Sequence, residues 1–147
     1  MATDLQIVID CTDPDAVSMF WLSALRGYDY PGSDPNRPPG SPPPGFRTWE
    51  AWADAQGIPE DQRYDQRTII DTVRERPDIH FVAVPEKKTV KNRLHLDLHV
   101  TAGASPDEAR AVQDAEVERL IALGATLVER REYAVMRDVE GNEFCVT

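Results

Sequence analysis

The stretch "LHLDLHVT", residues 94–101, decides the expected fold, because it repeats an earlier part of the chain. Its leucines alternate with His95, Asp97 and His99, which is typical of a strand with one buried face. The stretch "LQIVIDCT", residues 5–12, alternates in the same way and can be laid on it without a gap. We therefore expect two related strands, one opening each half of the chain.

Each expected strand is followed by the signals of a capped helix. The first helix should begin at Asp13–Pro14 and stop before Gly27, since aspartate caps helices and proline suits their first position. The second should begin at Ser105–Pro106, where Glu108 is spaced to complete a capping box, and stop before Gly124. The repeat therefore includes a strand and a helix in each half.

Further strands are expected near residues 67–72, 78–84, 126–138 and 143–147. Seven prolines within residues 29–46 predict a surface excursion there, followed by a short helix ending near Gly57. The prediction is an α+β fold of two βαβββ modules forming one domain, residues 1–147. The modules should cover about 3–86, with a proline-rich insert at 29–66, and 92–147.

Charge and cysteine content limit the partners and the compartment. With 26 acidic and 16 basic side chains, the formal net charge is −10, which disfavours binding to nucleic acid or to anionic membranes. The first residues lack the pattern of a signal peptide, and the chain lacks a long apolar run. Two cysteines do not make a disulfide framework. We expect a cytoplasmic protein.

Four stretches together resemble the vicinal oxygen chelate superfamily, and within it the glyoxalase-like domain proteins. They are "FWLSALRGY" (20–28), "TVKNRLHLDLHV" (89–100), "EVERLIALGAT" (116–126) and "MRDVEGNEFCV" (136–146). The last is the most specific, since a strand, an Asp-x-Glu-Gly-Asn turn and a closing strand typify the end of these domains. The resemblance implies that the two modules curl their sheets into a cup with the helices outside, and that His95, Asp97 and His99 face the cup.

The resemblance also implies where a divalent metal would bind. Enzymes of the superfamily hold the metal with His and Glu from the first and last strand of each module, and the metal acts as a Lewis acid. His95 matches one of these four positions. Gln6 takes the equivalent place in the first module, Cys145 replaces the closing glutamate, and Val82 is its counterpart in the repeat as aligned by sequence.

Because three of the four ligands are missing, we expect a cup that binds a small organic molecule and has no metal cofactor. Superfamily members that sequester antibiotics such as bleomycin are of this kind. The residues expected to line it are Gln6, Val8, His80, Val82, His95, Asp97, Glu143 and Cys145. The alternative is a metal-dependent lyase, isomerase or dioxygenase using His95 with Glu143 or His80. A Cys145 thiolate with His95 would suit zinc. A weaker alternative is an interaction module without a ligand. We expect a homodimer, since edge strands of such modules pair with another copy.

Several other residues have two interpretations. His99 is either a rim histidine bonded to a carboxylate or part of an acid–base pair with Asp97. Cys145 is either a nucleophile or a small core residue. Trp49 and Trp52 either cover the cup or anchor the excursion. The basic run Lys87, Lys88, Lys91 and Arg93 is expected to be an exposed linker.

Overall fold

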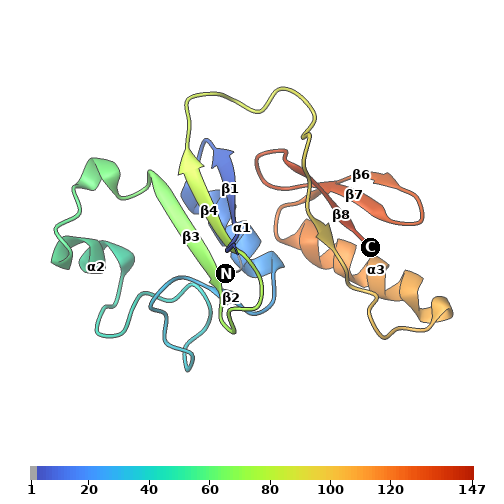
Figure 1. The fold of residues 1–147 in the computed structure, drawn as a ribbon, viewed down its shortest axis with the longest axis horizontal. Coiled ribbons are helices and arrows are strands. Elements are labelled where there is room, and N and C mark those ends of the chain that lie inside the picture. Colours follow the sequence, from blue (N-terminus) through green and yellow to red (C-terminus); the bar gives the residue numbers. More distant parts are fainter. Residues whose placement is uncertain (1–2) are drawn as a thin grey trace. The chain divides into compact units, whose positions relative to one another are not determined.

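The computed structural model describes residues 3–147 and contains two four-stranded sheets (Figure 1). The strands are β1 Gln6–Cys11, β2 Tyr28–Asp29, β3 Gln66–Asp71, β4 Asp78–Ala83, β5 Asp97–Leu98, β6 Thr126–Arg130, β7 Ala134–Arg137 and β8 Glu143–Val146. The helices are α1 Pro14–Ala24, α2 Trp49–Ala55 and α3 Pro106–Ala122, with a 3₁₀ turn, η1, at Glu60–Gln62. No helix within residues 3–147 is long and apolar enough to cross a bilayer.

The two sheets have the same topology. The strand order is β1-β4-β3-β2 in the first and β5-β8-β7-β6 in the second. In both, the opening strand pairs in parallel with the last strand of the module, and the remaining pairs are antiparallel. The α+β class and the two βαβββ modules predicted from the repeat are confirmed.

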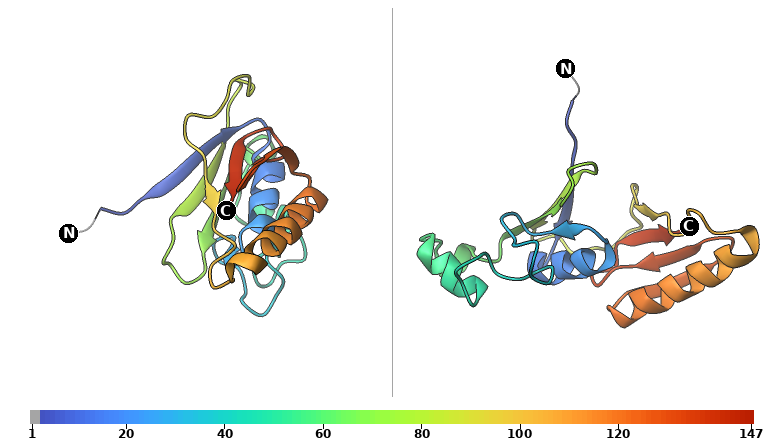
Figure 2. Two further views of the ribbon diagram at one scale, coloured as in Figure 1. Left: turned by 90° about the vertical axis from the view of Figure 1, so that its right-hand side faces the viewer. Right: turned by 90° about the horizontal axis from the view of Figure 1, so that it is seen from below.

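Each sheet carries one long helix on one face (Figure 2). Helix α1 packs on β3 and β4, and α3 packs on β6 and β8. In the second module Leu120 of α3 and Met136, Phe144 and Val146 of the strands are fully buried. Since successive strand residues point to opposite faces, Glu143 and Cys145 belong to the face away from α3. That face is the one available for a site.

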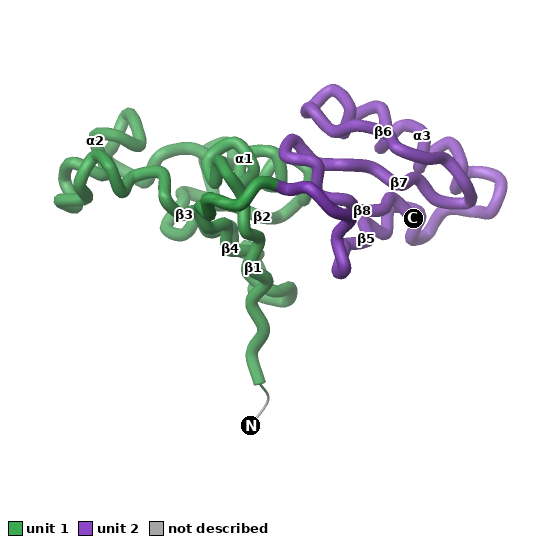
Figure 3. The backbone as a smooth tube through the Cα atoms, turned by 90° about the horizontal axis from the view of Figure 1, so that it is seen from above, with its two compact units in different colours: residues 1–87 green, residues 88–147 purple. Residues whose placement is uncertain are grey.

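The chain divides into two compact units (Figure 3). Unit 1 ends at Lys87 and unit 2 comprises Lys88–Thr147. The proline-rich excursion lies in unit 1 between β2 and β3 and contains α2, which is capped by Thr48 and followed by Gly57 at φ 67°. The expected short helix is confirmed there.

The strand expected at residues 94–101 is shorter than predicted. Only Asp97–Leu98 form β5, although backbone bonds to β8 continue through the carbonyls of Leu96 and Leu98. The segment has a hydrogen-bonded neighbour on one side only, because β5 is an edge strand. Leu94 is 72% exposed, so the buried face expected of this strand does not extend to it.

The register of the sheets shifts the sequence alignment of the two closing strands, β4 and β8, by two residues. Val8 lies opposite His80, and Asp97 lies opposite Cys145. If Asp97 corresponds to Val8, as the opening strands align, then His80 is the counterpart of Cys145. The predicted match between Val82 and Cys145 came from the similarity of "HFVA" and "EFCV". That match preserves the face of each residue but shifts its position along the strand.

The capping box of α3 leads to a stability prediction. The Glu108 carboxylate accepts bonds from the backbone N–H (3.1 Å) and the hydroxyl (2.6 Å) of Ser105. We expect Ser105→Ala to lower the free energy of unfolding by about 1 kcal/mol, as for other helix caps. Urea unfolding followed by circular dichroism measures this. Ser33→Ala, in the excursion, should leave the midpoint unchanged, and equal losses in both variants would argue against a role for the cap.

Candidate functional site

The candidate site lies in unit 2, on the face of the sheet away from α3. A pocket of about 580 Å³ opens there. His95, Cys145 and Glu143 line it together with Val135 and Tyr133. Val135 lies opposite Cys145, and Arg137 lies opposite Glu143, in the β7–β8 ladder. The pocket therefore combines a small apolar wall with several titratable groups.

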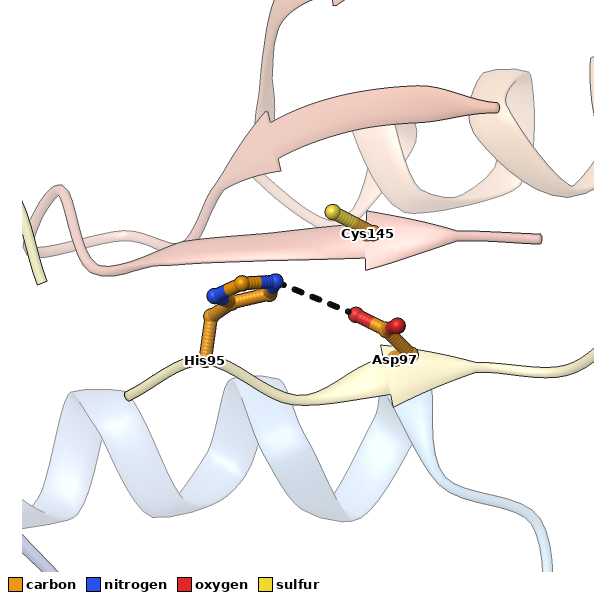
Figure 4. Close-up of side chains that lie close together, drawn as sticks. All are labelled: His95, Asp97 and Cys145. Atoms are coloured by element: carbon orange, nitrogen blue, oxygen red, sulfur yellow. Dashed lines mark ion pairs between the residues drawn. The ribbon is translucent and has the colours of Figure 1, made fainter. Parts of the chain in front are cut away.

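Three of the expected residues meet at β5 and β8 (Figure 4). The imidazole of His95 and the carboxylate of Asp97 project toward β8, which carries Cys145. His95 Nε2 and Asp97 Oδ1 are 3.5 Å apart, an ion pair whenever the imidazole is protonated. One nitrogen, oxygen or sulfur atom from each of the three residues lies within 4.8 Å of the others. These are donors of three different chemical kinds.

The Cys145 thiol is in its neutral form at neutral pH. Burial raises its pKa, and the Asp97 carboxylate raises it further through its charge and through a hydrogen bond. A thiol must ionise before it attacks or binds a metal. The site therefore lacks the lowered thiol pKa of an activated nucleophile, which favours the interpretation of Cys145 as a small buried residue.

Glu143 has partners for both of its carboxylate oxygens. Oε2 accepts the backbone N–H of Asn92 at 2.9 Å and lies 3.0 Å from Lys88 Nζ, while Oε1 lies 3.5 Å from Arg137 Nε. Burial raises the pKa of Glu143, but the bonds from Asn92 and Lys88 outweigh burial and bring the pKa to about 2. Glu143 is therefore an ionised residue of the pocket wall that holds Asn92, Lys88 and Arg137 in place.

The contact of Lys88 with Glu143 corrects one sequence interpretation. The basic run was expected to be an exposed linker, yet the Lys88 side chain is only 23% exposed and is held against Glu143. Lys88 and Lys91 both line the pocket. A buried acid 55 residues further along the chain could not be matched to this lysine from sequence spacing.

The remaining expected residues lie in unit 1. Gln6 and Val8 on β1 share a face with His80 and Val82 on β4, because the register places Val8 opposite His80. Val8 is 55% exposed. The His80 Nδ1 is 2.7 Å from the hydroxyl of Thr68, its neighbour on β3. His80 also lines a second pocket, of about 520 Å³, which was not foreseen.

The other histidine and the turn residues have structural roles. His99 Nδ1 is 2.7 Å from the Thr147 hydroxyl, whereas a carboxylate partner was expected. The Asp138 carboxylate accepts the backbone N–H groups of Glu140 and Asn142 and so forms the β7–β8 turn, as expected from the Asp-x-Glu-Gly-Asn stretch. Trp49 Nε1 donates to the Gly40 carbonyl at 3.1 Å, which joins two parts of the excursion.

The donor set of unit 2 differs from the His and Glu ligands of a metal-dependent relative. Mn(II) and similar hard ions prefer oxygen and imidazole ligands, whereas a thiol suits softer metals. His95 is an available imidazole, but Glu143 is committed to Lys88, Arg137 and Asn92. The residues present fit zinc better than manganese, because zinc accepts sulfur, nitrogen and oxygen together.

Several solved structures share the fold of this chain. A glyoxalase/bleomycin resistance protein/dioxygenase family enzyme from Burkholderia phytofirmans PsJN matches with a TM-score of 0.57 and 20% identity, over 98% of this chain and 97% of that chain. The fosfomycin resistance protein FosX from Mesorhizobium loti matches with a TM-score of 0.55 and 12% identity, over 99% and 91%. FosX from Listeria monocytogenes, complexed with Mn(II) and sulfate, matches with a TM-score of 0.54 and 11% identity, over 99% and 92%.

At these identities the structural matches establish a shared fold alone. No curated protein sequence matches the chain. The family model for the glyoxalase-like domain matches residues 6–147, which is nearly the whole chain and includes both modules and the excursion. The chain therefore belongs to the glyoxalase-like domain family.

Proposed function

We propose that this protein binds a small organic molecule in the unit 2 pocket and does so without the divalent metal of the metal-dependent relatives. The observation that carries the proposal is the position of Glu143. Its two oxygens are engaged by Asn92, Lys88 and Arg137, so recruiting it to a metal would leave two cations without their partner. The neutral Cys145 thiol supports the same conclusion.

The pocket has the properties of a ligand site. Its volume of about 580 Å³ lies within the range of small-molecule sites, which combine apolar walls with a few polar groups. Val135 and Tyr133 supply apolar surface, while His95 and Lys91 offer hydrogen-bonding groups to a ligand.

The proposal also includes a reducing, cytoplasmic setting, which the two free cysteines support. It includes a homodimer as well, which the edge strand β5 supports because it could pair with another copy.

A pocket-filling substitution tests ligand binding. Val135→Trp places an indole into the pocket, since Val135 is half-buried and lines it. We expect fragments that show saturation transfer from the wild type in NMR to lose it in this variant. Val139→Trp, at an exposed position outside the pocket lining, is the matched control and should keep every hit. Hits that persist in Val135→Trp would refute binding at this site.

A zinc-dependent function is the second candidate, favoured by the proximity of His95, Asp97 and Cys145. Zinc held by these residues would act as a Lewis acid toward a bound oxygen. For this, Cys145 would have to lose its thiol proton, whose pKa burial and Asp97 raise, so zinc affinity would rise with pH.

Metal analysis of untagged protein, purified without chelators, separates the two candidates. The metal-free proposal expects far less than one equivalent of manganese, iron, nickel or zinc. Near-stoichiometric zinc that disappears in Cys145→Ser and persists in Cys11→Ser would establish the zinc site instead. Near-stoichiometric manganese that depends on His95 would overturn both.

A further inference from the structure

The excursion of unit 1 forms a pocket that is separate from the proposed site of unit 2. It has a volume of about 520 Å³ and is lined by the excursion, the first residues of β3 and one residue of β4. Tyr30, Trp49, Trp52 and Tyr64 line it, and His80 reaches it from β4. The concentration of aromatic residues is the feature that needs explanation, because the whole chain has only three tryptophans and four tyrosines.

The aromatic side chains are held in place by their own contacts. Trp49 packs edge-on against both Tyr30 (centroids 5.1 Å apart, 77°) and Trp52 (5.6 Å, 83°). The Tyr30 hydroxyl is 2.9 Å from the hydroxyl of Ser18 in α1, and Trp49 Nε1 donates to Gly40. Trp49 and Trp52 are each only half-buried. A ligand would therefore meet fixed aromatic surfaces, which lowers the entropic cost of binding.

The charges around this pocket favour a cation. Arg63 pairs with Asp54, and Arg67 pairs with Asp15 at 2.9 Å, so both lining arginines are already neutralised by residues outside the lining. Two lining carboxylates remain, Glu50 and Asp65.

Within residues 3–147 neither of these carboxylates has an ion-pair partner, and Glu50 accepts a hydrogen bond from the Tyr64 hydroxyl at 3.4 Å. Hydrogen bonds from its own backbone N–H and from Thr48 lower the pKa of Glu50, and the carboxylate is charged at neutral pH at its ordinary pKa as well.

The pocket already contains one interaction of the kind that such a ligand would make. The guanidinium carbon of Arg67 lies 5.3 Å from the centre of the Tyr64 ring. The same attraction between a cation and an aromatic face is strongest for tryptophan and is the means by which aromatic cages bind quaternary ammonium groups. Trp49 and Trp52 line the same pocket as two carboxylates that have no ion-pair partner among residues 3–147.

From these observations we propose that the excursion pocket of unit 1 binds a small organic cation, with a quaternary or alkylated ammonium group placed against Trp49 and Trp52 and near Glu50. The second nitrogen of His80, whose Nδ1 is bonded to Thr68, provides a hydrogen bond to a polar group elsewhere on the ligand. The proposal does not depend on the function of the unit 2 pocket.

Choline and its uncharged isostere 3,3-dimethyl-1-butanol test this proposal on the full chain. The three tryptophans give three indole N–H signals in ¹H–¹⁵N NMR spectra. We expect choline at millimolar concentration to shift the signals of Trp49 and Trp52 and to leave that of Trp21, which is buried beside Phe20 in the core of unit 1. The uncharged isostere should bind about tenfold more weakly, since it lacks the cation–π attraction.

Two variants locate the site. Trp52→Ala should abolish the response of Trp49, and Glu50→Gln should weaken choline binding several-fold while keeping the fold. Glu60→Gln, an exposed acid of the excursion outside the pocket lining, is the matched control and should bind as the wild type does. Equal binding of choline and its isostere, or no shift of Trp49 and Trp52, would overturn the proposal, as would equal effects of Glu50→Gln and Glu60→Gln.

Discussion

Replacing Phe144 by alanine should lower the free energy of unfolding by about 3–5 kcal/mol, the range for large-to-small changes in a packed core. Phe144 is fully buried in the middle of β8, and its neighbour across the β7–β8 ladder, Met136, is fully buried as well. Leu120 of α3 is also inaccessible to solvent. The cavity would open in unit 2, which has only 60 residues, Lys88–Thr147, to build a core.

Urea unfolding of the full chain, followed by far-UV circular dichroism, measures this loss. Phe46→Ala is the matched control, because Phe46 is a half-buried residue of the excursion outside the regular elements. We expect its effect to be less than half that of Phe144→Ala. A loss below about 1 kcal/mol for Phe144→Ala would mean that the face of β8 toward α3 is not the packed core of unit 2.

Replacing Glu143 by glutamine should destabilise the protein at neutral pH and have little effect at low pH. At pH 7 the variant loses the charge-assisted bonds to Lys88, Arg137 and Asn92, with an expected cost of about 1–3 kcal/mol. The folded pKa of about 2 lies below the ordinary glutamate value. The stability that Glu143 contributes is therefore complete above the unfolded pKa and is lost as the pH falls toward the folded pKa.

Urea midpoints measured between pH 7 and pH 2 test this dependence. The curves of wild type and Glu143→Gln should be well separated at pH 7 and should converge as the pH approaches 2. Glu132→Gln, at an exposed glutamate of the β6–β7 turn, should follow the wild type throughout. A constant separation at every pH would show that the loss comes from packing and that the charge of Glu143 contributes nothing.

The parts of the site that sequence could predict are those that depend on strand alternation. Alternation in "LHLDLHVT" places His95 and Asp97 on one face, and alternation in "EFCV" places Glu143 and Cys145 on one face, as the structure has them. The structure buries Phe144 and Val146, which lie on the opposite face of the same strand. Such inferences use only neighbouring residues.

The parts that sequence could not predict depend on contacts between distant segments. The pairing of Lys88 with Glu143 joins residues with no common pattern. The pocket of Trp49 and Trp52 depends on how a proline-rich excursion folds back to Tyr30 and Gly40. The two-residue error in the repeat has the same origin, since the register of β1 with β4 is set by the whole sheet.

The sequence by itself determined the two βαβββ modules, their helix caps and the polar face of each closing strand. Alternation, caps and turns involve residues that are close together in the sequence, so the side chains of a short segment are enough to favour them. Only the tertiary structure decided that Glu143 is held by two cations, that burial and Asp97 raise the pKa of the Cys145 thiol, and that the excursion makes a second pocket. These features depend on distances between segments far apart in the chain, which packing sets.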